Sequence, residues 1–430
     1  MAGAGVYWFI ERREVVELSL LRSGLRLHPR TCDRGYARST RTPHGSTHAW
    51  VEVAESLPKL DAVPEELRQR AEALLDEEHR LLSDAETWEA LVRQWADVAA
   101  ASGAAHLQVF LRQVAQRVMV WADDRQVEDS RSALLLELTL FGNAEARGLD
   151  LWRCLSFRDE RELSAAGPQI AALIEDMAQQ LRDQVPAVAF PSGEQVVVFP
   201  PGAAAASFFH EVCGHPLEGD VVARGASYLA RKLGQQIAEP FLTVSDDPTE
   251  DRGSVSFRWD DEGVPAQSTS LIRQGRIDAP LLDEESARAL GRSSNGHGRR
   301  VSFRHAPLPR MAHTRVEPHT GGLETCIQGV RSGLLVQHLN PRHMHLLSGD
   351  FSFYVTEARE IRDGRLGKRL NPGILSGNGL EALAAIDFVG SDSANLFATR
   401  GCRKLDHGPL PISFGLPSVR FTRLITRAWR

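Results

Sequence analysis

The sequence predicts an α+β fold built as an N-terminal α/β domain over residues 1–190 and a β-rich C-terminal domain over residues 191–430. Three observations support this division. A chain of 430 residues contains enough material for two domains with separate cores. Strand-like and helix-like segments alternate in the first half, whereas short strands bounded by Gly, Asp and Pro dominate the second half. We therefore expect the boundary near residue 190.

The first half contains four segments with the period-two or β-branched pattern of strands and three with helical spacing. The expected strands are Val15–Leu21, Thr47–Val53, His106–Val120 and Ala133–Phe141. The expected helices are Pro64–Leu82, Thr87–Ala101 and Gly167–Val185. The last helix is amphipathic, because Ile170, Leu173, Ile174 and Met177 share one side of it.

The second half opens with a turn at Pro191-Ser192-Gly193, after which Gln195–Phe199 is expected to form a short buried strand. Pro200-Pro201-Gly202 then leads into an alanine-rich helix. Further expected strands are Gly253–Trp259, Ser268–Ile272, Phe351–Ala358 and Ile412–Phe421. Asp363-Gly364 is a hairpin signal. Antiparallel pairing is the expected arrangement in this half.

Composition excludes several classes of protein. The net charge of −6 and a pI of about 6.2 do not suit a dedicated nucleic-acid binder, since no stretch concentrates unopposed Lys or Arg. No apolar run has the length of a membrane span. The first ten residues lack a basic region and an apolar region of signal-peptide type, so we expect a cytoplasmic protein.

The five cysteines are scattered, odd in number and without C-x-x-C spacing. This pattern is not a disulfide framework. In a reducing compartment each cysteine is by default a small buried hydrophobe, and one of them is a candidate exception.

The most informative segment is Phe208–Asp220, which places His210, Glu211 and His215 within six residues. In an H-E-x-x-H helix the two histidines stand roughly 40° apart and share one Zn²⁺. Here the spacing is i, i+5, which separates the rings by about 140° on a regular helix. Both can reach one ion only if the helix widens by a π-type turn or ends between them. Gly214 permits either outcome, because it lacks a Cβ and tolerates left-handed geometry.

The competing interpretation is that His210 and His215 are ordinary residues at the end of a helix. A hexapeptide of this kind arises by chance in on the order of a few per cent of chains this long. A tetrahedral hydrolytic site needs three protein ligands and an open position, so the hypothesis requires a third ligand.

A candidate third ligand is Cys402, which lies in Arg400-Gly401-Cys402-Arg403-Lys404. Neighbouring positive charge and a metal ion both lower the pKa of a thiol, so a thiolate flanked by three cations suits zinc. Spacing alone does not single this cysteine out.

Several motifs, taken in order, resemble the TldD/PmbA metallopeptidase family and in particular its catalytic TldD-type members. They are Phe209–Asp220, Asp260–Gly263, Gly298–Arg300, Pro309–Met311, Gly349–Phe353 and Gly377–Gly379. The resemblance covers residues 195–425 and is weaker over residues 1–190.

The resemblance implies that His210, His215 and Cys402 bind zinc and that Glu211 is the general base that activates the zinc-bound water. It also implies an α/β N-terminal domain, a β-rich C-terminal domain, and two subunits that enclose a cavity. Family members cleave unfolded or extended peptides, including modified precursors. They commonly pair with a PmbA-type subunit that lacks the motif, so a heterodimer or a homodimer is expected.

The sequence departs from the family pattern at two positions, where His297 and His313 replace the usual Asn. If these positions line the cavity, titratable rings replace amide donors that would hold a peptide backbone. Cys213 inside the motif is also unusual and is expected to be a packing residue.

Other residues have two interpretations each. Glu218 and Asp220 are candidate acceptors for an imidazole N–H, or solvated carboxylates at a helix end. His343 and His345 form an H-x-H pair for which surface or core roles are favoured over a second metal. Arg299, Arg300 and Arg310 are candidates for binding a substrate carboxylate or an oxyanion, or for structural ion pairs.

Three functions are consistent with these features. The first is a zinc peptidase of HExxxH type. The second is a non-catalytic subunit that binds peptides or modulates a partner through the same cavity. The third keeps the zinc chemistry but acts on the amide of a small biosynthetic molecule.

Overall fold

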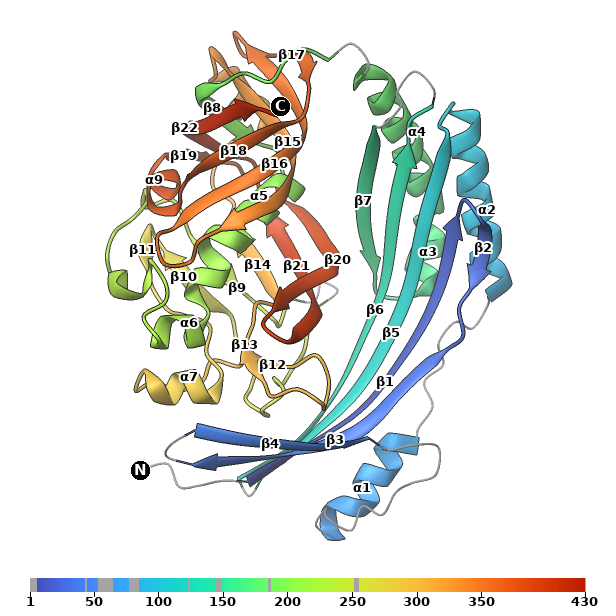
Figure 1. Ribbon diagram of the computed structural model, residues 1–430, viewed down its shortest axis with the longest axis vertical. Coiled ribbons are helices and arrows are strands. Elements are labelled where there is room, and N and C mark those ends of the chain that lie inside the picture. Colours follow the sequence, from blue (N-terminus) through green and yellow to red (C-terminus); the bar gives the residue numbers. More distant parts are fainter. Residues whose placement is uncertain are drawn as a thin grey trace.

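The protein is described by a computed structural model that covers residues 6–42, 45–52, 65–76, 85–122, 124–143, 149–184, 187–250 and 255–429. Figure 1 shows a long curved sheet with helices on its outer side, and a second region rich in short strands that lies against the inner side. The mixed α+β class and the β-rich character of the second region are confirmed.

The first region contains one seven-stranded sheet in the order β4-β3-β1-β5-β6-β7, with β2 paired to β1. Its strands are β1 (Val6–Leu21), β2 (Gly24–Leu27), β3 (Thr31–Thr42), β4 (Gly45–Glu52), β5 (His106–Ala122), β6 (Arg125–Phe141) and β7 (Asp150–Phe157). All of their pairings are antiparallel. The strands expected at Val15–Leu21, His106–Val120 and Ala133–Phe141 lie within β1, β5 and β6, and the strand expected at Thr47–Val53 coincides with β4 up to Glu52, while residue 53 lies outside the described residues.

Four helices pack on this sheet, namely α1 (Glu65–Asp76), α2 (Ala85–Ala101), α3 (Glu160–Ala165) and α4 (Gly167–Gln184). Trp88 and Trp95 of α2 and Ile170 and Ile174 of α4 share a core with leucines of β5 and β6. The three expected helices are present as α1, α2 and α4. Residue 64 and residues 77–82 of the first expected helix, and residue 185 of the third, lie outside the described residues.

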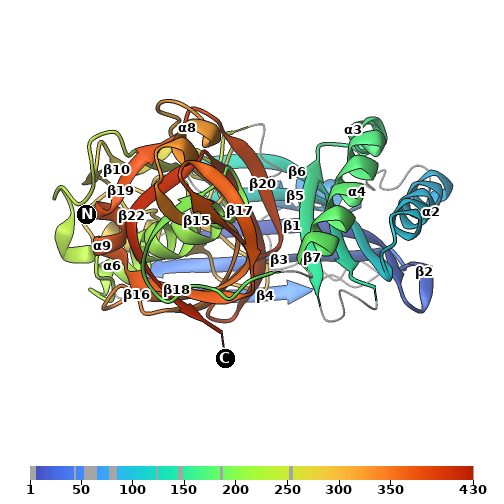
Figure 2. The same ribbon diagram turned by 90° about the horizontal axis from the view of Figure 1, so that it is seen from above.

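The second region begins at β8 (Gly193–Phe199), so sheet membership changes between β7 and β8. Its seven-stranded sheet also contains β15 (Ser332–Met344), β16 (Asp350–Arg362), β17 (Arg365–Leu370), β18 (Gly373–Asn378), β19 (Ile386–Val389) and β22 (Val419–Ala428). Because β15 pairs with both β8 and β16, five of these strands close into a ring (Figure 2).

A six-stranded sheet in the order β11-β10-β9-β14-β21-β20 lies beside the ring. Its strands are β9 (Val244–Asp246), β10 (Thr269–Arg273), β11 (Arg276–Ile277), β14 (His313–Val316), β20 (Ala394–Lys404) and β21 (His407–Leu416). A separate pair is formed by β12 (Gly298–Arg299) and β13 (Leu308–Pro309). Cys402 therefore lies on β20, an edge strand of the six-stranded sheet.

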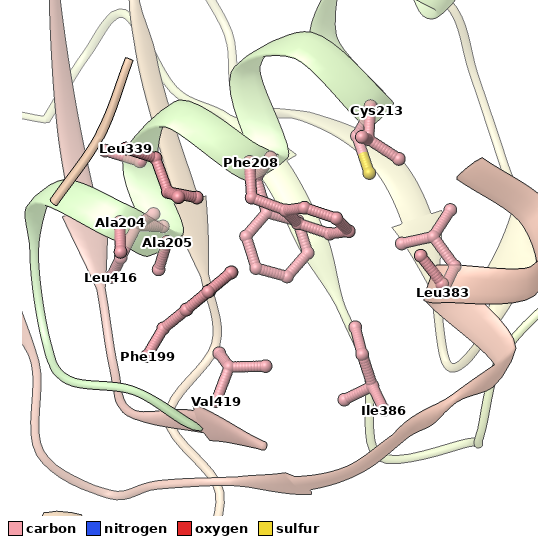
Figure 3. Packing of buried hydrophobic residues seen from close by; sticks show 14 of the residues in the cluster. Phe199, Ala204, Ala205, Phe208, Cys213, Leu339, Leu383, Ile386, Leu416 and Val419 are labelled. Atoms are coloured by element: carbon pink, nitrogen blue, oxygen red, sulfur yellow. The ribbon is translucent and has the colours of Figure 1, made fainter. Parts of the chain in front are cut away.

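Short helices connect these strands: α5 (Ala203–Phe209), α6 (Gly219–Ala223), α7 (Glu284–Ala289), α8 (Leu323–Gln328) and α9 (Gly379–Ala384). Helix α5 is anchored by Phe208, whose ring makes edge contacts with Phe351 of β16 and Phe421 of β22. Figure 3 shows the apolar cluster around it, with the sulfur of Cys213 pointing into the cluster. The alanine-rich helix is thus held inside the strand ring, and the metal motif follows at its end.

Two expectations for the second region need correction. Within the described residues, Gly253–Trp259 is irregular, and Trp259 makes only an isolated bridge to Pro265. Val255 and Phe257 are buried because they pack against Ala133 and Leu135 of β6 without a ladder. Ile412–Phe421 is two strands, since β21 ends at Leu416 and β22 begins at Val419 in another sheet.

The hairpin expected at Asp363-Gly364 is confirmed. These residues join the antiparallel strands β16 and β17, and both have positive φ, 45° for Asp363 and 72° for Gly364. Pairing in the second region is mostly antiparallel, with parallel pairs at β8–β15 and β14–β21. None of the helices in the described part of the chain combines the length and apolar character that a membrane span requires.

Candidate metal centre

The helix that carries the motif changes its winding at the first histidine. Helix α5 ends at Phe209, His210–Gly214 form a π-helical turn, and His215–Leu217 form a 3₁₀ turn. A π turn contains more residues than an α turn, so positions five apart come to the same side. The rings of His210 and His215 are consequently neighbours, with centroids 4.5 Å apart. The i, i+5 spacing is accommodated by widening, as the sequence requires.

The role of Gly214 differs from the one expected. Its backbone is right-handed, with φ −62° and ψ −67°, so left-handed freedom is not used. A Cβ at this position would lie 1.9 Å from the sulfur of Met311. Glycine is needed here because Met311 packs directly against the backbone of the turn. Tyr228 supports the same turn, since its hydroxyl donates to the carbonyl of Val212 at 2.6 Å.

Cys402 approaches these histidines from the edge strand β20. Its Sγ lies 3.2 Å from Nε2 of His215. Gly401 has a φ of +57°, and the register of β20 against β21 shifts between Ala398 and Cys402. An irregularity of this kind re-aims a side chain out of the regular strand pattern. The bulge thus directs the thiol of Cys402 toward the π turn.

The described residues contain one group of three or more His, Cys, Asp or Glu side chains placed to share a metal ion. It consists of His210, His215 and Cys402, whose ligand atoms all lie within 4.8 Å of one another. Ligands of one tetrahedral zinc stand about 3.3–3.8 Å apart, so only small shifts are needed. Nδ1 of His210 is buried and has no hydrogen-bond partner among the described residues. This donor set fits a zinc ion.

The charges around the cluster favour a thiolate. Burial raises the pKa of Cys402, but His215 and His210 outweigh it and bring that pKa to about 4. Burial lowers the pKa of His215, but Cys402 and Glu218 raise it well above its usual value. In the metal-free protein the pair is therefore a thiolate beside an imidazolium, and metal binding would displace the imidazolium proton.

Glu218 stands behind His215. Its Oε2 is 3.0 Å from His215 Nδ1 and 3.1 Å from Nζ of Lys404. Despite burial, which raises it, the pKa of Glu218 is lowered to about 2 by His215 and Lys404. Asp220 contacts Lys404 and Arg224 and no imidazole among the described residues. Of the two candidate acceptors, the geometry therefore favours Glu218.

Glu211 lies within the π turn and is partly exposed. Among the described residues, no side chain forms a hydrogen bond with its carboxylate. The carboxylate is thus free to accept a hydrogen bond from a water or a substrate.

The other candidates lie away from the cluster or have structural partners. His297 and His313 are buried around Asp246 and Ser413 and do not join the three ligands. His345 bonds Ser348, and the His343 ring centroid is 6.2 Å from that of His345. Arg310 donates to the carbonyl of Cys402 at 2.5 Å, and Arg300 donates to the carbonyl of Asp261.

Three residues that support the centre, namely Met311, Tyr228 and Gly401, were given no such role from the sequence. Their contacts come from segments far apart in the chain. The only local signal was Gly401, which directly precedes Cys402. A glycine directly before a candidate ligand in a strand suggests a β-bulge.

The chain is similar to several known proteins. Residues 192–426 match the model of the PmbA/TldA metallopeptidase C-terminal domain. A metalloprotease TldD homolog from Haemophilus influenzae is 32% identical over 55% of this chain and 49% of its own length. A zinc metalloprotease TldD homolog from Saccharolobus solfataricus is 27% identical over 59% of this chain and 55% of its own length.

Among solved structures, TldE from Thermococcus kodakarensis shares the fold. Its TM-score is 0.75 at 18% identity, over 99% of this chain and 97% of that one. The chain spans about half the length of the curated relatives it matches.

Proposed function

The chain belongs to the TldD/PmbA metallopeptidase family, and from this premise we propose that it is a zinc-dependent peptidase that cleaves unfolded or extended peptides. The observation that carries the proposal is the convergence of His210, His215 and Cys402 at the end of α5. In the proposal these three residues hold the metal, and the protein works as a dimer whose subunits enclose the site.

Bound by two neutral imidazoles and one thiolate, a zinc ion would keep about one net positive charge and supply Lewis acidity to a water and a peptide carbonyl. Glu211 accepts the proton of that water and passes it to the departing amine. Its partial exposure and lack of a side-chain partner support this role.

The surrounding residues position the ligands. Glu218 accepts the Nδ1 proton of His215, which leaves Nε2 as the nitrogen that faces Cys402. Lys404 and Arg310 offset the charge of Glu218 at 3.1 Å and 3.8 Å, so that carboxylate stays ionised behind the site. Met311 and Tyr228 hold the π turn, which begins with the ligand His210 and is followed directly by the ligand His215.

The test is the Glu211→Gln variant, assayed for zinc content and for hydrolysis of an unstructured peptide. We expect zinc to be retained and hydrolysis to fall by about 10²–10⁴-fold, since only the proton transfer is removed. Glu285→Gln, at an exposed position on α7, is the matched control and should keep full activity. A Glu211→Gln protein with full zinc and full activity would contradict the proposal.

A non-catalytic subunit is the second candidate, because the fold is shared with the solved TldE structure. The fold does not distinguish the two roles, but the presence of the ligand cluster supports the catalytic one. Absence of zinc and of hydrolysis, alone and with a PmbA-type partner, would favour the non-catalytic role. A panel that compares peptides with acylated small amines separates a peptidase from a small-molecule amide hydrolase.

A further inference from the structure

A pocket of about 70 Å³ lies between the first sheet and the second region. One wall comes from β1, β5 and β6, and the other comes from the segment around Phe257, the end of β12 and the β21 strand. Its lining contains four arginines and one aspartate, which are Arg13, Arg131, Arg299, Arg300 and Asp261. The pocket therefore concentrates positive charge in a protein whose net charge is −6.

The single carboxylate does not balance these cations. Asp261 Oδ1 accepts from Arg131 at 2.7 Å, and its Oδ2 accepts the backbone N–H of Arg300 at 2.7 Å. Both of its oxygens are thus engaged, and the ion pair neutralises Arg131.

Among the described residues, Arg13 and Arg299 donate only to main-chain carbonyls. Arg13 bonds the carbonyl of Val301 at 3.3 Å, and Arg299 bonds those of Pro411, at 3.0 Å, and Met311. Neither has a carboxylate within ion-pair distance in the described part of the chain. Burial, with Arg310 and Arg131 nearby, lowers the pKa of Arg299 to about 10 against the opposing effect of Asp261. An anion in the pocket would relieve this excess charge.

The rest of the lining suits an anion with an apolar stem. Val114, Ala133, Val255 and Leu410 supply aliphatic surface, and Ser132, Ser256 and Gln116 supply polar groups. A guanidinium presents its donors as a planar fork that matches the two oxygens of a carboxylate.

The pocket adjoins the candidate metal centre through shared residues. Leu410 lines the pocket and is the direct strand partner of Cys402. Met311 accepts from Arg299 through its carbonyl, and its side chain packs against Gly214 of the π turn. A chain segment that occupies the pocket would thus lie next to the ligand cluster.

We propose that this pocket, which we name the arginine pocket, binds a carboxylate of the peptide substrate beside the metal centre. The inference rests on the proposed function for the identity of the ligand. The carboxylate can come from the C-terminus of the peptide or from an Asp or Glu side chain, and the experiment distinguishes these sources.

The experiment measures binding by fluorescence anisotropy with the Glu211→Gln protein, so that no cleavage is needed. Three labelled unstructured peptides of one length are compared. The first has a free C-terminus and no acidic side chain, the second has an amidated C-terminus and no acidic side chain, and the third is amidated with one Glu. We expect the first or the third to bind about tenfold more tightly than the second, as one charge-assisted contact predicts.

Tighter binding of the first peptide assigns the site to the terminal carboxylate, and tighter binding of the third assigns it to a side chain. Equal affinities within about twofold would overturn the inference. This peptide comparison needs no change in the pocket, so it stands even if a pocket variant fails to fold.

Arg13→Gln is the pocket variant, because Arg13 makes a single carbonyl contact and is only partly buried. It should abolish the preference, whereas Arg26→Gln, which removes the same charge from an exposed position on β2, should keep it. A preference that survives Arg13→Gln unchanged in a folded protein would contradict the assignment. Hydrolysis by the parent protein is measured separately, so failure of the peptidase proposal is distinguishable from failure of the pocket.

Discussion

Two groups of buried histidines differ in what surrounds them. At the metal centre, His210 and His215 lie next to each other and to the Cys402 thiolate. Nδ1 of His210 has no hydrogen-bond partner among the described residues. The second group, which we name the Asp246 group, consists of His297 and His313. Nδ1 of His313 lies 2.8 Å from Oγ of Ser413. Nε2 of His297 lies 3.3 Å from Oδ1 of Asp246 but does not form a hydrogen bond with it.

The comparison shows that burial of an imidazole does not indicate a metal ligand. Around Asp246, each ring lies next to a hydroxyl or a carboxylate of the protein. At the metal centre, by contrast, two imidazoles and a thiolate lie next to one another, and their ligand atoms are all within 4.8 Å of each other. A bound cation is the partner that such a set lacks.

The largest expected difference between the two groups is in zinc binding. Cys402→Ser removes the thiolate, and we expect the zinc content to fall to near zero and hydrolysis to fall on the order of a thousandfold. Metal analysis after dialysis and a peptide assay check this. Cys32→Ser, at an exposed cysteine, is the matched control and should change neither. Retention of stoichiometric zinc in Cys402→Ser would remove the distinction between the two groups.

The thiolate can be tested directly in the metal-free protein. An ordinary thiol loses about a hundredfold in alkylation rate between pH 7 and pH 5, since its thiolate fraction falls tenfold per unit below its pKa. The pKa of Cys402 is lowered to about 4 by the two histidines, against the effect of burial. Its thiolate therefore persists as the pH falls to 5.

We expect the iodoacetamide rate at Cys402, followed by mass spectrometry, to be nearly constant between pH 7 and pH 5, and zinc to protect the residue. Cys32 in the same sample provides the ordinary profile. A hundredfold decline at Cys402 would show that the histidines do not stabilise its thiolate.

A smaller effect on zinc affinity is expected for a residue that contacts a ligand without binding the metal itself. Glu218→Gln removes the negative charge next to His215 Nδ1, so zinc affinity should fall by about 10–100-fold. Competition with a chromogenic chelator measures this loss. Asp220→Asn should change the affinity by less than about threefold, since Asp220 contacts Lys404 and Arg224 instead of an imidazole. Equal losses in both variants would mean that Glu218 acts only through the local charge.

The smallest effect is expected in the Asp246 group. His313→Asn keeps a polar side chain next to Ser413, so zinc content and activity should stay within about threefold of the parent, with a loss of about 1 kcal/mol in the free energy of unfolding. Chemical denaturation and the peptide assay check both values. Loss of zinc or a hundredfold loss of activity would place His313 in the site.

Local patterns predicted much of the fold. Asp363-Gly364 turned out to be a hairpin because both residues accept positive φ without help from the rest of the molecule. The strand expected at Gly253–Trp259 shows the limit, since Val255 and Phe257 in its described part, residues 255–259, pack against β6 in an irregular conformation. Strand β3 was not predicted because its sequence, TCDRGYARSTRT, is mostly polar, yet it pairs with β1 along ten positions from Val6↔Thr40 to Val15↔Thr31.

The candidate site likewise has one part that the sequence predicts and another part that depends on tertiary contacts. The spacing of His210 and His215 required a change in helical winding, and the π turn provides it. The sequence could not place Cys402 beside them, because it lies 187 residues from His215 and approaches through a bulge at Gly401. The contacts of Met311 and Tyr228 with the π turn are likewise tertiary and leave no pattern in the sequence.

The most direct measurement is an anomalous difference map at the zinc edge from zinc-loaded crystals of the intact oligomer. We predict one strong peak per chain, at about 2.0–2.3 Å from Nε2 of His215, a ring nitrogen of His210 and Sγ of Cys402. A peak held by other residues, or none among these three in crystals that contain stoichiometric zinc, would contradict the assignment.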